Sequence, residues 1–262
     1  MKYILIVLFL SCLFNCKPYH KTNRIYKIQA RALAKTLRQI PTPDSLTHPH
    51  WIGTTNFNLR KPNFVIIHHT AQNSCDSTLR TFTLIPTQVS AHYVICKDGT
   101  IHHMLNDYFR AWHAGISKWG TLTDLNSSSI GIELDNNGFE PFPDPQLNSL
   151  IRLLDTLKRK YSIPVSNFLG HSDISPRRKV DPNIYFPWKL LADCGFGNWY
   201  DDTAMVQVPS TFNFIQGLRT IGYEVTDSIA VIISFKRHFV QDTSRVFNDR
   251  DKKILFNLLK KY

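Results

Sequence analysis

The pattern of apolar and polar positions along the chain predicts strands that alternate with helices. The apolar run from Phe64 to Ile67 has the length and β-branched content of a buried strand, and the segment SSSIGIELDNNG (127–138) supplies another. Between residues 144 and 161, apolar side chains recur at positions 147, 150, 151, 154 and 157, the spacing of a helix that lies on a sheet. This order indicates an α/β fold with a central mixed β-sheet flanked by helices.

Shorter elements fill the space between these segments. Residues 75–85 read as a short helix that Asp76 or Ser77 caps. The segment SAHYVICKDGTIHHML (90–105) predicts a hairpin, because its Asp98-Gly99 pair suits a tight turn between two alternating strands. VSNFLG (165–170) reads as a short strand that leads into GHSDISPRRKVDPN (170–183).

The N-terminal residues read as an export signal. Residues 1–16 carry one lysine and then an apolar run that is too short for a comfortable membrane span. Leu13 to Cys16 resemble a bacterial lipobox, so we expect a lipoprotein signal over 1–16 and acylation of Cys16. Asn15 is bulkier than the usual residue before the cut, and Cys12 is the competing site. Residues 17–56 read as a tether and lead-in with a helical patch at 24–40.

The last part of the chain has a different character. Residues 208–262 contain three helical patterns, each of which opens on a residue able to cap it, and the polar segment YDDTAMVQ (200–207) precedes them. We expect a small C-terminal three-helix domain over 208–262. On composition alone it is either a packing appendage or a binding module.

Composition and charge limit the function classes. With 43% hydrophobic and 19% charged residues, the 262-residue chain is globular rather than generally disordered. Its formal net charge of +11 suits an anionic partner such as nucleic acid, a membrane surface or a polymer that carries carboxylates. Besides Cys16, the expected mature chain has Cys75, Cys96 and Cys194, without a CxxC pair. This odd set argues against a disulfide framework or a thiolate zinc cluster, and leaves open which pair forms any single disulfide.

Metal-ligand residue types gather at two places. His171 and Asp181 lie in the segment 170–183, and a catalytic zinc site usually takes three protein ligands. The third is expected at the end of the first strand, where side chains project into the crevice of an α/β sheet. His68 and His69 both lie there, on opposite faces of the strand, and spacing alone does not choose between them. Each histidine taken singly is better explained as a satisfied polar or surface residue, so the interpretation depends on their joint occurrence.

Two further residues suit hydrolysis of an amide. Glu133 lies within an apolar strand, where an unpaired buried carboxylate costs several kcal/mol, and near a metal it can move a proton from water to a leaving amine. Lys179 lies two residues before Asp181 and can stabilise an oxyanion. The alternatives are a carboxylate at the sheet edge paired with an arginine, and a solvated basic turn.

Six segments carry a resemblance to a known family. IIHHTA, SAHYVI, AWHAG, SIGIELDNNG, GHSDISPRRKVDP and FPWKLL, in this order, resemble the zinc-dependent N-acetylmuramoyl-L-alanine amidases, which share a fold with phage-lysozyme-type amidases and peptidoglycan recognition proteins. The resemblance spans about residues 57–200 and implies a zinc amidase catalytic domain there. FNFIQGLRTIGYEV is similar to the first part of small three-helix peptidoglycan-binding domains.

The resemblance implies roles for individual residues. The zinc ligands are expected to be His68, His171 and Asp181, with Glu133 and Lys179 as catalytic residues. Substrate-binding positions are expected at Trp112, His113, Asn136 and Arg178. Two departures stand out: His69 replaces a tyrosine that is frequent in related enzymes, and Arg177 replaces a residue that is commonly small.

These features together predict an exported, lipid-anchored enzyme of the periplasm or outer membrane. It is expected to cut the amide between N-acetylmuramic acid, or its anhydro form, and L-alanine, to act as a monomer, and to bind no nucleic acid, since no recognition helix or stacking motif is evident. The alternative is a non-catalytic peptidoglycan-binding lipoprotein of the same fold. A cytoplasmic recycling amidase would share the motifs, but it would have no use for the signal.

Overall fold

The computed structural model describes residues 19–39, 54–56 and 58–262, which belong to two compact units, one up to Asn58 and one from Leu59 to Tyr262. In the first unit, the helix α1 (His20–Leu37) has no buried residue and confirms the expected helical patch, with a start four residues earlier. The predicted signal, with Cys12 and Cys16, lies outside the described residues. None of the helices in the described ranges is both long and apolar enough to cross a membrane.

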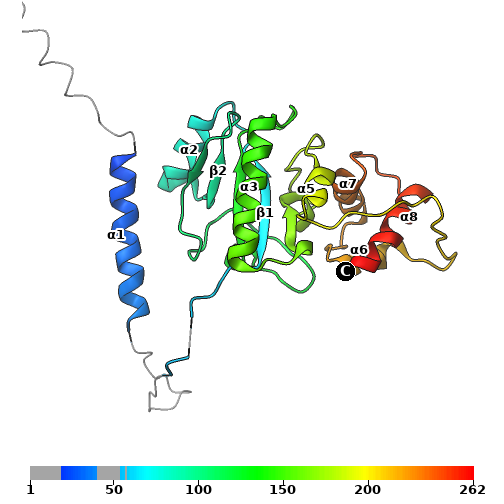
Figure 1. The fold of residues 1–262 in the computed structure, drawn as a ribbon, viewed down its shortest axis with the longest axis horizontal. Coiled ribbons are helices and arrows are strands. Elements are labelled where there is room, and N and C mark those ends of the chain that lie inside the picture. The colour runs from blue at the N-terminus through cyan, green and yellow to red at the C-terminus, as the bar shows by residue number, and fades with distance from the viewer. Residues whose placement is uncertain (1–18, 40–53, 57) are drawn as a thin grey trace, which may run out of the picture. The chain divides into compact units, whose positions relative to one another are not determined.

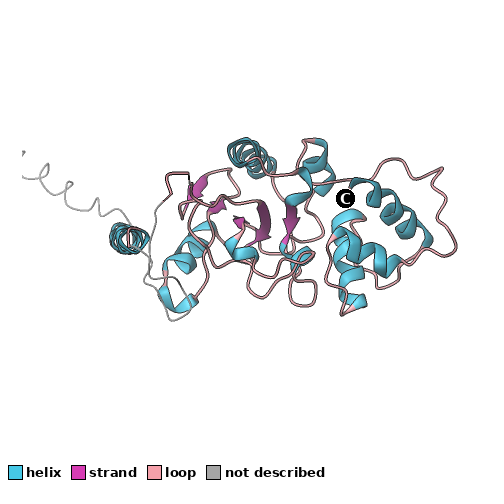
Figure 2. Cartoon of the chain, turned by 90° about the horizontal axis from the view of Figure 1, so that it is seen from below, coloured by secondary structure: helices cyan, strands magenta, loops and turns pink. Residues whose placement is uncertain are grey.

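Five strands form one mixed sheet in the second unit (Figure 2). Their order across the sheet is β3-β2-β4-β1-β5, in which β3 is antiparallel to β2 and all other neighbours are parallel. The strands are β1 (Phe64–His69), β2 (Tyr93–Ile95), β3 (Ile101–His103), β4 (Ser129–Leu134) and β5 (Phe168–Gly170). The mixed sheet and the hairpin β2-β3 are both as predicted, and Gly99 in the turn has a φ of +88° that suits glycine.

One face of the sheet packs against α3 (Asp144–Tyr161), which has the predicted bounds (Figure 1). Side chains of β1, β2 and β4 that point to this face meet the apolar stripe of α3. The cluster includes Val65, Ile67, Ile95, Ile130, Ile132 and Leu134 from the strands, and Leu147, Leu150, Leu154 and Leu157 from the helix. Alternate residues of β1 and β4 therefore point to the other face.

The remaining helices are short. They are α2 (Cys75–Thr83), α4 (His171–Ile174), α5 (Trp188–Asp193), α6 (Phe214–Ile221), α7 (Ser228–Phe239) and α8 (Asp249–Leu258), with the 3-10 turns η1 (Ile85–Thr87), η2 (Leu125–Ser127), η3 (Val165–Asn167) and η4 (Leu259–Lys261). The cap of α2 is Ser74, whose side chain accepts a hydrogen bond from the Ser77 backbone N–H, rather than the expected Asp76 or Ser77.

The three predicted C-terminal helices are present as α6, α7 and α8 (Figure 1). Of these, α7 contacts α4 and α5. We call residues 208–262, which contain them, the C-terminal module. Its apolar side chains share one cluster with the second face of the sheet and the elements beside it. Ile66 of β1, Leu169 of β5, Leu125 of η2 and Ile174 of α4 pack with Leu218, Val231, Phe235 and Leu255 of the module. The module and the sheet thus belong to one compact unit, and the domain boundary near residue 200 stays a prediction.

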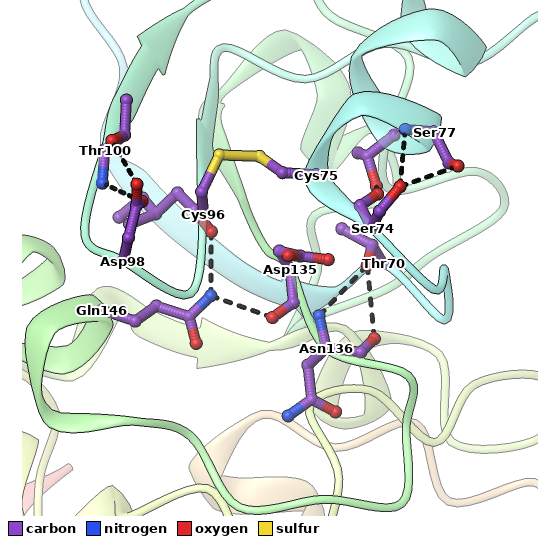
Figure 3. Close-up of a disulfide and its surroundings, with 12 residues drawn as sticks. Thr70, Ser74, Cys75, Ser77, Cys96, Asp98, Thr100, Asp135, Asn136 and Gln146 are labelled. Atoms are coloured by element: carbon purple, nitrogen blue, oxygen red, sulfur yellow. Dashed lines mark hydrogen bonds between the residues drawn. A yellow bond between two sulfur atoms is a disulfide. The ribbon is translucent and has the colours of Figure 1, made fainter.

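A disulfide joins Cys75 to Cys96, 21 residues apart (Figure 3). It ties the first residue of α2 to the residue after β2. Beside it, the Gln146 side chain donates to the carbonyls of Ile95 and Asp135, and so links α3 to the ends of β2 and β4. Cys194 is exposed and unpaired. Of the pairs that the sequence left open, Cys75 with Cys96 is therefore the one that forms.

Candidate metal centre

The register of two parallel strands places a histidine beside a carboxylate. β1 and β4 pair with His68 opposite Glu133, on the face that α3 does not cover. His69 is the next residue and points the opposite way, as the alternation of the strand requires. The sheet thus selects His68 for this site.

Three ligand atoms converge at this face. The Nδ1 atoms of His68 and His171 lie 3.0 Å apart, and Asp181 Oδ2 lies 2.9 Å from the first and 3.0 Å from the second. All three residues are buried. His171 opens α4 directly after β5, and the loop returns to it because the Ser172 N–H donates to the carbonyl of Asp181 at 2.8 Å.

The three residues fit a zinc ion. Tetrahedral zinc with ligand bonds of roughly 2.0–2.1 Å holds its ligand atoms about 3.3 Å apart, close to the separations seen here. Two imidazoles and a carboxylate are also a donor set that zinc prefers. The described residues contain one other such group, Cys75, Cys96 and His102, but its two cysteines form the disulfide.

Hydrogen bonds on the outer side orient both histidines. His171 Nε2 lies 3.1 Å from the carbonyl of Ala114, which can only accept, so the proton is on Nε2 and the Nδ1 lone pair is free. His68 Nε2 lies 3.0 Å from His113 Nδ1, and His113 Nε2 lies 3.2 Å from Ser129 Oγ, which donates to the Leu125 carbonyl. A proton on each Nε2 satisfies this chain and again leaves His68 Nδ1 free.

Burial keeps His68 and His113 neutral. It lowers the pKa of His68 to about 4, helped by the neighbouring His171, and it holds the pKa of His113 well below its usual range, helped by His68. Burial alone would raise the pKa of Asp181, but the contacts of its carboxylate with His171 and His68 outweigh that effect and hold the pKa well below its ordinary value. Neutral imidazoles and an ionised carboxylate are the protonation states that bind a metal.

Glu133 is a buried carboxylate with an unused oxygen. It is 9% exposed, and its Oε2 has no hydrogen-bond partner among the described residues. Burial raises its pKa to about 8, the charge of Asp181 adds to the rise, and the charge of Lys179 opposes it. A carboxylate whose pKa lies near neutrality suits proton transfer.

Lys179 is half-buried, and its charge acts on the carboxyl group of Glu133. Burial lowers the pKa of His68 and of His69, and the positive charge of Lys179 adds to both shifts. The same charge opposes the rise in the pKa of Glu133. The charge of Lys179 thus acts on the ligand His68 and on Glu133, and the charge of the ligand Asp181 acts on Glu133.

The four predicted substrate-binding residues differ in exposure. Trp112 is 48% exposed, and Arg178 is exposed and donates to the carbonyl of Ile116. Asn136 is fully buried and its side chain is occupied by Glu140, Asn183 and Gly138. His113 is also buried, behind His68. Substrate binding by these residues stays a prediction.

The contact of His113 with His68 was not predicted from the sequence, which indicated His113 only as a substrate-binding residue. Gly131, which lies in β4 on the same face as Glu133, makes room for it: a Cβ there would lie 2.5 Å from His113 Cγ. A glycine inside an apolar strand was the available signal, since such a glycine indicates a close approach of another group.

Comparisons with known proteins agree with this site. The profile of the family described as N-acetylmuramoyl-L-alanine amidase matches residues 58–184. The N-acetylmuramoyl-L-alanine amidase AmiD of Escherichia coli is 35% identical in an alignment that covers 67% of this chain and 74% of that protein. The chain belongs to this amidase family.

Two solved structures extend the likeness. A complex of Escherichia coli AmiD with anhydro-N-acetylmuramic acid-L-Ala-D-gamma-Glu-L-Lys superposes with a TM-score of 0.72 at 31% identity, over 80% of this amidase and 93% of that chain. AmpDh3 of Pseudomonas aeruginosa in complex with anhydromuramic pentapeptide gives a TM-score of 0.72 at 27% identity, over 83% and 98%. The predicted family, fold class and enzyme class are confirmed.

Proposed function

We propose that this amidase holds a zinc ion with His68, His171 and Asp181 and hydrolyses the amide between N-acetylmuramic acid and the L-alanine of the stem peptide. The observation that carries the proposal is the convergence of these three ligand atoms, about 3 Å apart, beside the unpartnered carboxylate oxygen of Glu133. A protein that only bound the cell wall would gain nothing from this buried carboxylate, whose ionisation is unfavourable.

The chemistry divides among the residues of the site. Zinc, when bound, supplies a Lewis acid that polarises a carbonyl and makes water more acidic. Glu133 Oε2 accepts a proton from the attacking water and delivers it to the nitrogen of the leaving L-alanine. The ammonium of Lys179 stabilises the negative charge that develops on the former carbonyl oxygen.

The anhydro form of the sugar is included in the proposed substrate. Two solved relatives that match most of this chain were captured with anhydromuramyl peptides. The net charge of +11 also favours a substrate whose stem peptide carries free carboxylates.

We further propose that the chain is exported and anchored through a lipid on Cys16. The support is the signal-like sequence of residues 1–16 and the disulfide between Cys75 and Cys96, since such bonds persist in oxidising compartments. Expression of the full gene with Cys16→Ala should move the protein from the membrane fraction to the soluble fraction. If Cys12→Ala has this effect instead, the lipid is on Cys12.

The test of function uses the full chain with defined substrates. The protein is incubated with peptidoglycan, muropeptides and anhydromuropeptides, with and without a chelator, and the products are identified by mass spectrometry. Free peptides that begin with L-alanine, lost on chelation and restored by zinc, are expected. Asp181→Ala should abolish zinc binding and cleavage, whereas Asp193→Ala, an exposed carboxylate, should change neither. Intact substrate that retains the wild-type protein would instead identify a wall-binding protein.

A further inference from the structure

The helix that carries His171 is too short to hold its own position. α4 has four residues, His171–Ile174, and a single turn of helix is not stable in isolation. The direction of the His171 side chain, and with it the place of Nδ1, must therefore depend on what α4 contacts.

The main contact is made through Asp173, two residues after His171. Its side chain is 1% exposed and accepts three hydrogen bonds: from the Gly170 N–H at 2.8 Å, from the Tyr223 hydroxyl at 2.7 Å and from His238 Nδ1 at 2.8 Å. The first bond is local, but Tyr223 and His238 belong to the C-terminal module. Three donors around one carboxylate compensate for its burial.

The two donor rings, of His238 and Tyr223, each pack against a tryptophan ring. The His238 ring stacks on Trp188 of α5, with ring centroids 3.9 Å apart and planes at 11°. The Tyr223 ring packs edge to face on Trp119 at 5.0 Å, and burial together with the charge of Asp173 raises the pKa of Tyr223 well above its ordinary value. The phenol therefore keeps its proton and remains a donor.

Further bonds join the same two parts of the molecule. Ser234 Oγ of α7 donates to the carbonyl of Ser172 at 2.8 Å, and the Gly120 N–H donates to the carbonyl of Gly222 at 2.7 Å. The segment before Gly120 reaches α4 as well, because the Lys118 N–H donates to the Ile174 carbonyl at 2.8 Å. Each residue of α4 thus has a defined partner outside the helix, and several of the partners lie in the C-terminal module.

We propose that Asp173, Tyr223 and His238 are positioning residues, through which the C-terminal module holds α4 so that His171 Nδ1 stays within reach of the ion shared with His68 and Asp181. This role rests on the proposed zinc site. It gives the module a function in the metal centre itself, distinct from the wall binding that its sequence suggests.

The test compares zinc affinity and stability in the full chain. Zinc affinity is measured by competition with a chromogenic chelator, the ligand geometry by the visible spectrum of the cobalt-substituted protein, and stability by thermal unfolding. Tyr223→Phe and His238→Leu each remove one donor to Asp173. We expect zinc affinity to fall roughly tenfold in each, the usual scale for residues that orient a ligand, and the cobalt spectrum to change.

A conservative variant and a matched control separate positioning from packing. His238→Asn places an amide donor near the position of Nδ1, so it should recover most of the affinity that His238→Leu loses. Ile254→Ala opens a cavity in the core of the module without touching Asp173, so it should lower the melting temperature and leave the affinity and the cobalt spectrum of the folded protein unchanged.

The outcomes are distinguishable. If Tyr223→Phe and His238→Leu bind zinc as tightly as the wild type, with the same cobalt spectrum, the module is packing only and the positioning role is wrong. If Ile254→Ala weakens zinc binding as much as these variants do, the effect is one of general stability, and the role is again wrong. A wild-type protein that binds no zinc would overturn the proposed function, and the positioning role with it.

Discussion

At the scale of single residues, the site places a buried acid, Glu133, beside the neutral imidazole of His68. Glu133 lies between Ile132 and Leu134, two side chains with no exposure, and its own ionisation is held back by the same burial. The sheet therefore supplies a proton acceptor whose pKa is far above that of a carboxylate in water. Replacing this group by an amide of the same size isolates its two effects, on rate and on stability.

We expect Glu133→Gln to lower kcat by roughly 10²–10⁴-fold, because the amide cannot accept a proton, and to leave the zinc content unchanged. The wild-type rate should fall as the pH drops and Glu133 becomes protonated, and this acid limb should be missing from any residual rate of the variant. Metal analysis and a pH profile of kcat/KM measure both. A variant with wild-type kcat would assign the proton transfer to another group.

In the metal-free protein, prepared with a chelator, Glu133→Gln should be more stable than the wild type at high pH. The pKa of Glu133 is about 8 in the folded protein and 4.5 ordinarily, so the folded state binds the proton more tightly. The stability that this proton contributes is fully present below pH 4.5 and is lost as the pH rises through 8. The shift corresponds to at most about 5 kcal/mol. Relative to wild type, the unfolding free energy of Glu133→Gln should therefore increase between pH 5 and pH 9, as urea unfolding would show. A difference that does not vary with pH would contradict the raised pKa.

Gly131→Ala should weaken zinc binding without touching a ligand. The added Cβ would lie 2.5 Å from His113 Cγ, so His113 must move and lose its contact with His68 Nε2. We expect about tenfold lower zinc affinity and a stability loss of roughly 1–3 kcal/mol. Gly120→Ala is the control: its Cβ meets nothing within 4 Å, so only its φ of +59° imposes a cost. Equal zinc affinity in both variants would show that His113 does not orient His68.

At the scale of elements, the disulfide closes the segment that contains α2 and the start of the hairpin. The bond between Cys75 and Cys96 encloses a loop of 21 residues, for which the loss of chain entropy in the unfolded state predicts about 3 kcal/mol of stabilisation. The double variant Cys75→Ser/Cys96→Ser should be less stable by this amount while it retains zinc, and Cys194→Ser should be neutral. Chemical unfolding measures all three. An unchanged midpoint in the double variant would mean that the loop is already ordered in the unfolded state.

Elements with a clear period were predictable from the sequence, whereas local choices among similar residues were not. The helix α3 has the expected bounds because its apolar positions recur with the helical spacing over about three turns. The cap of α2 was misplaced because Ser74, Asp76 and Ser77 are all capping types, and the backbone at Ser74 decides. The pairing of the cysteines depends on distances across the fold, which spacing does not contain.

At the scale of the whole molecule, the C-terminal module completes the core. Ile66, Leu125, Leu169 and Ile174 pack against it, so its removal would expose one face of the sheet to water. A fragment of residues 59–207, which lacks the module, should therefore be insoluble or lack cooperative unfolding. A fragment of residues 59–262 is the control and should unfold in one transition, because it contains the entire second unit. Circular dichroism on heating compares the two, and cooperative unfolding of the shorter fragment would establish an independent catalytic domain.

The candidate ligands were predictable from the sequence, but their supports were not. His68, His171 and Asp181 are of ligand type and lie in motifs of a known family. The partners of Asp173 lie 50 and 65 residues further along the chain, and no local pattern marks Tyr223 or His238 as donors to it. Such contacts arise only when α4 and the module meet in the folded chain.

The in-register pairing of β1 with β4 has a consequence for how this enzyme tolerates change. The separation of His68 from Glu133 equals one step across a parallel sheet, about 4.8 Å, and backbone hydrogen bonds rather than side-chain contacts set it. Substitutions at the neighbouring apolar positions can therefore drift in size without altering the spacing between metal ligand and proton acceptor. A single residue inserted into β4 ahead of Glu133 would instead turn the acceptor toward α3, and one inserted into β1 ahead of His68 would turn the ligand the same way. Insertions and deletions in these two strands are therefore expected to abolish activity where substitutions do not.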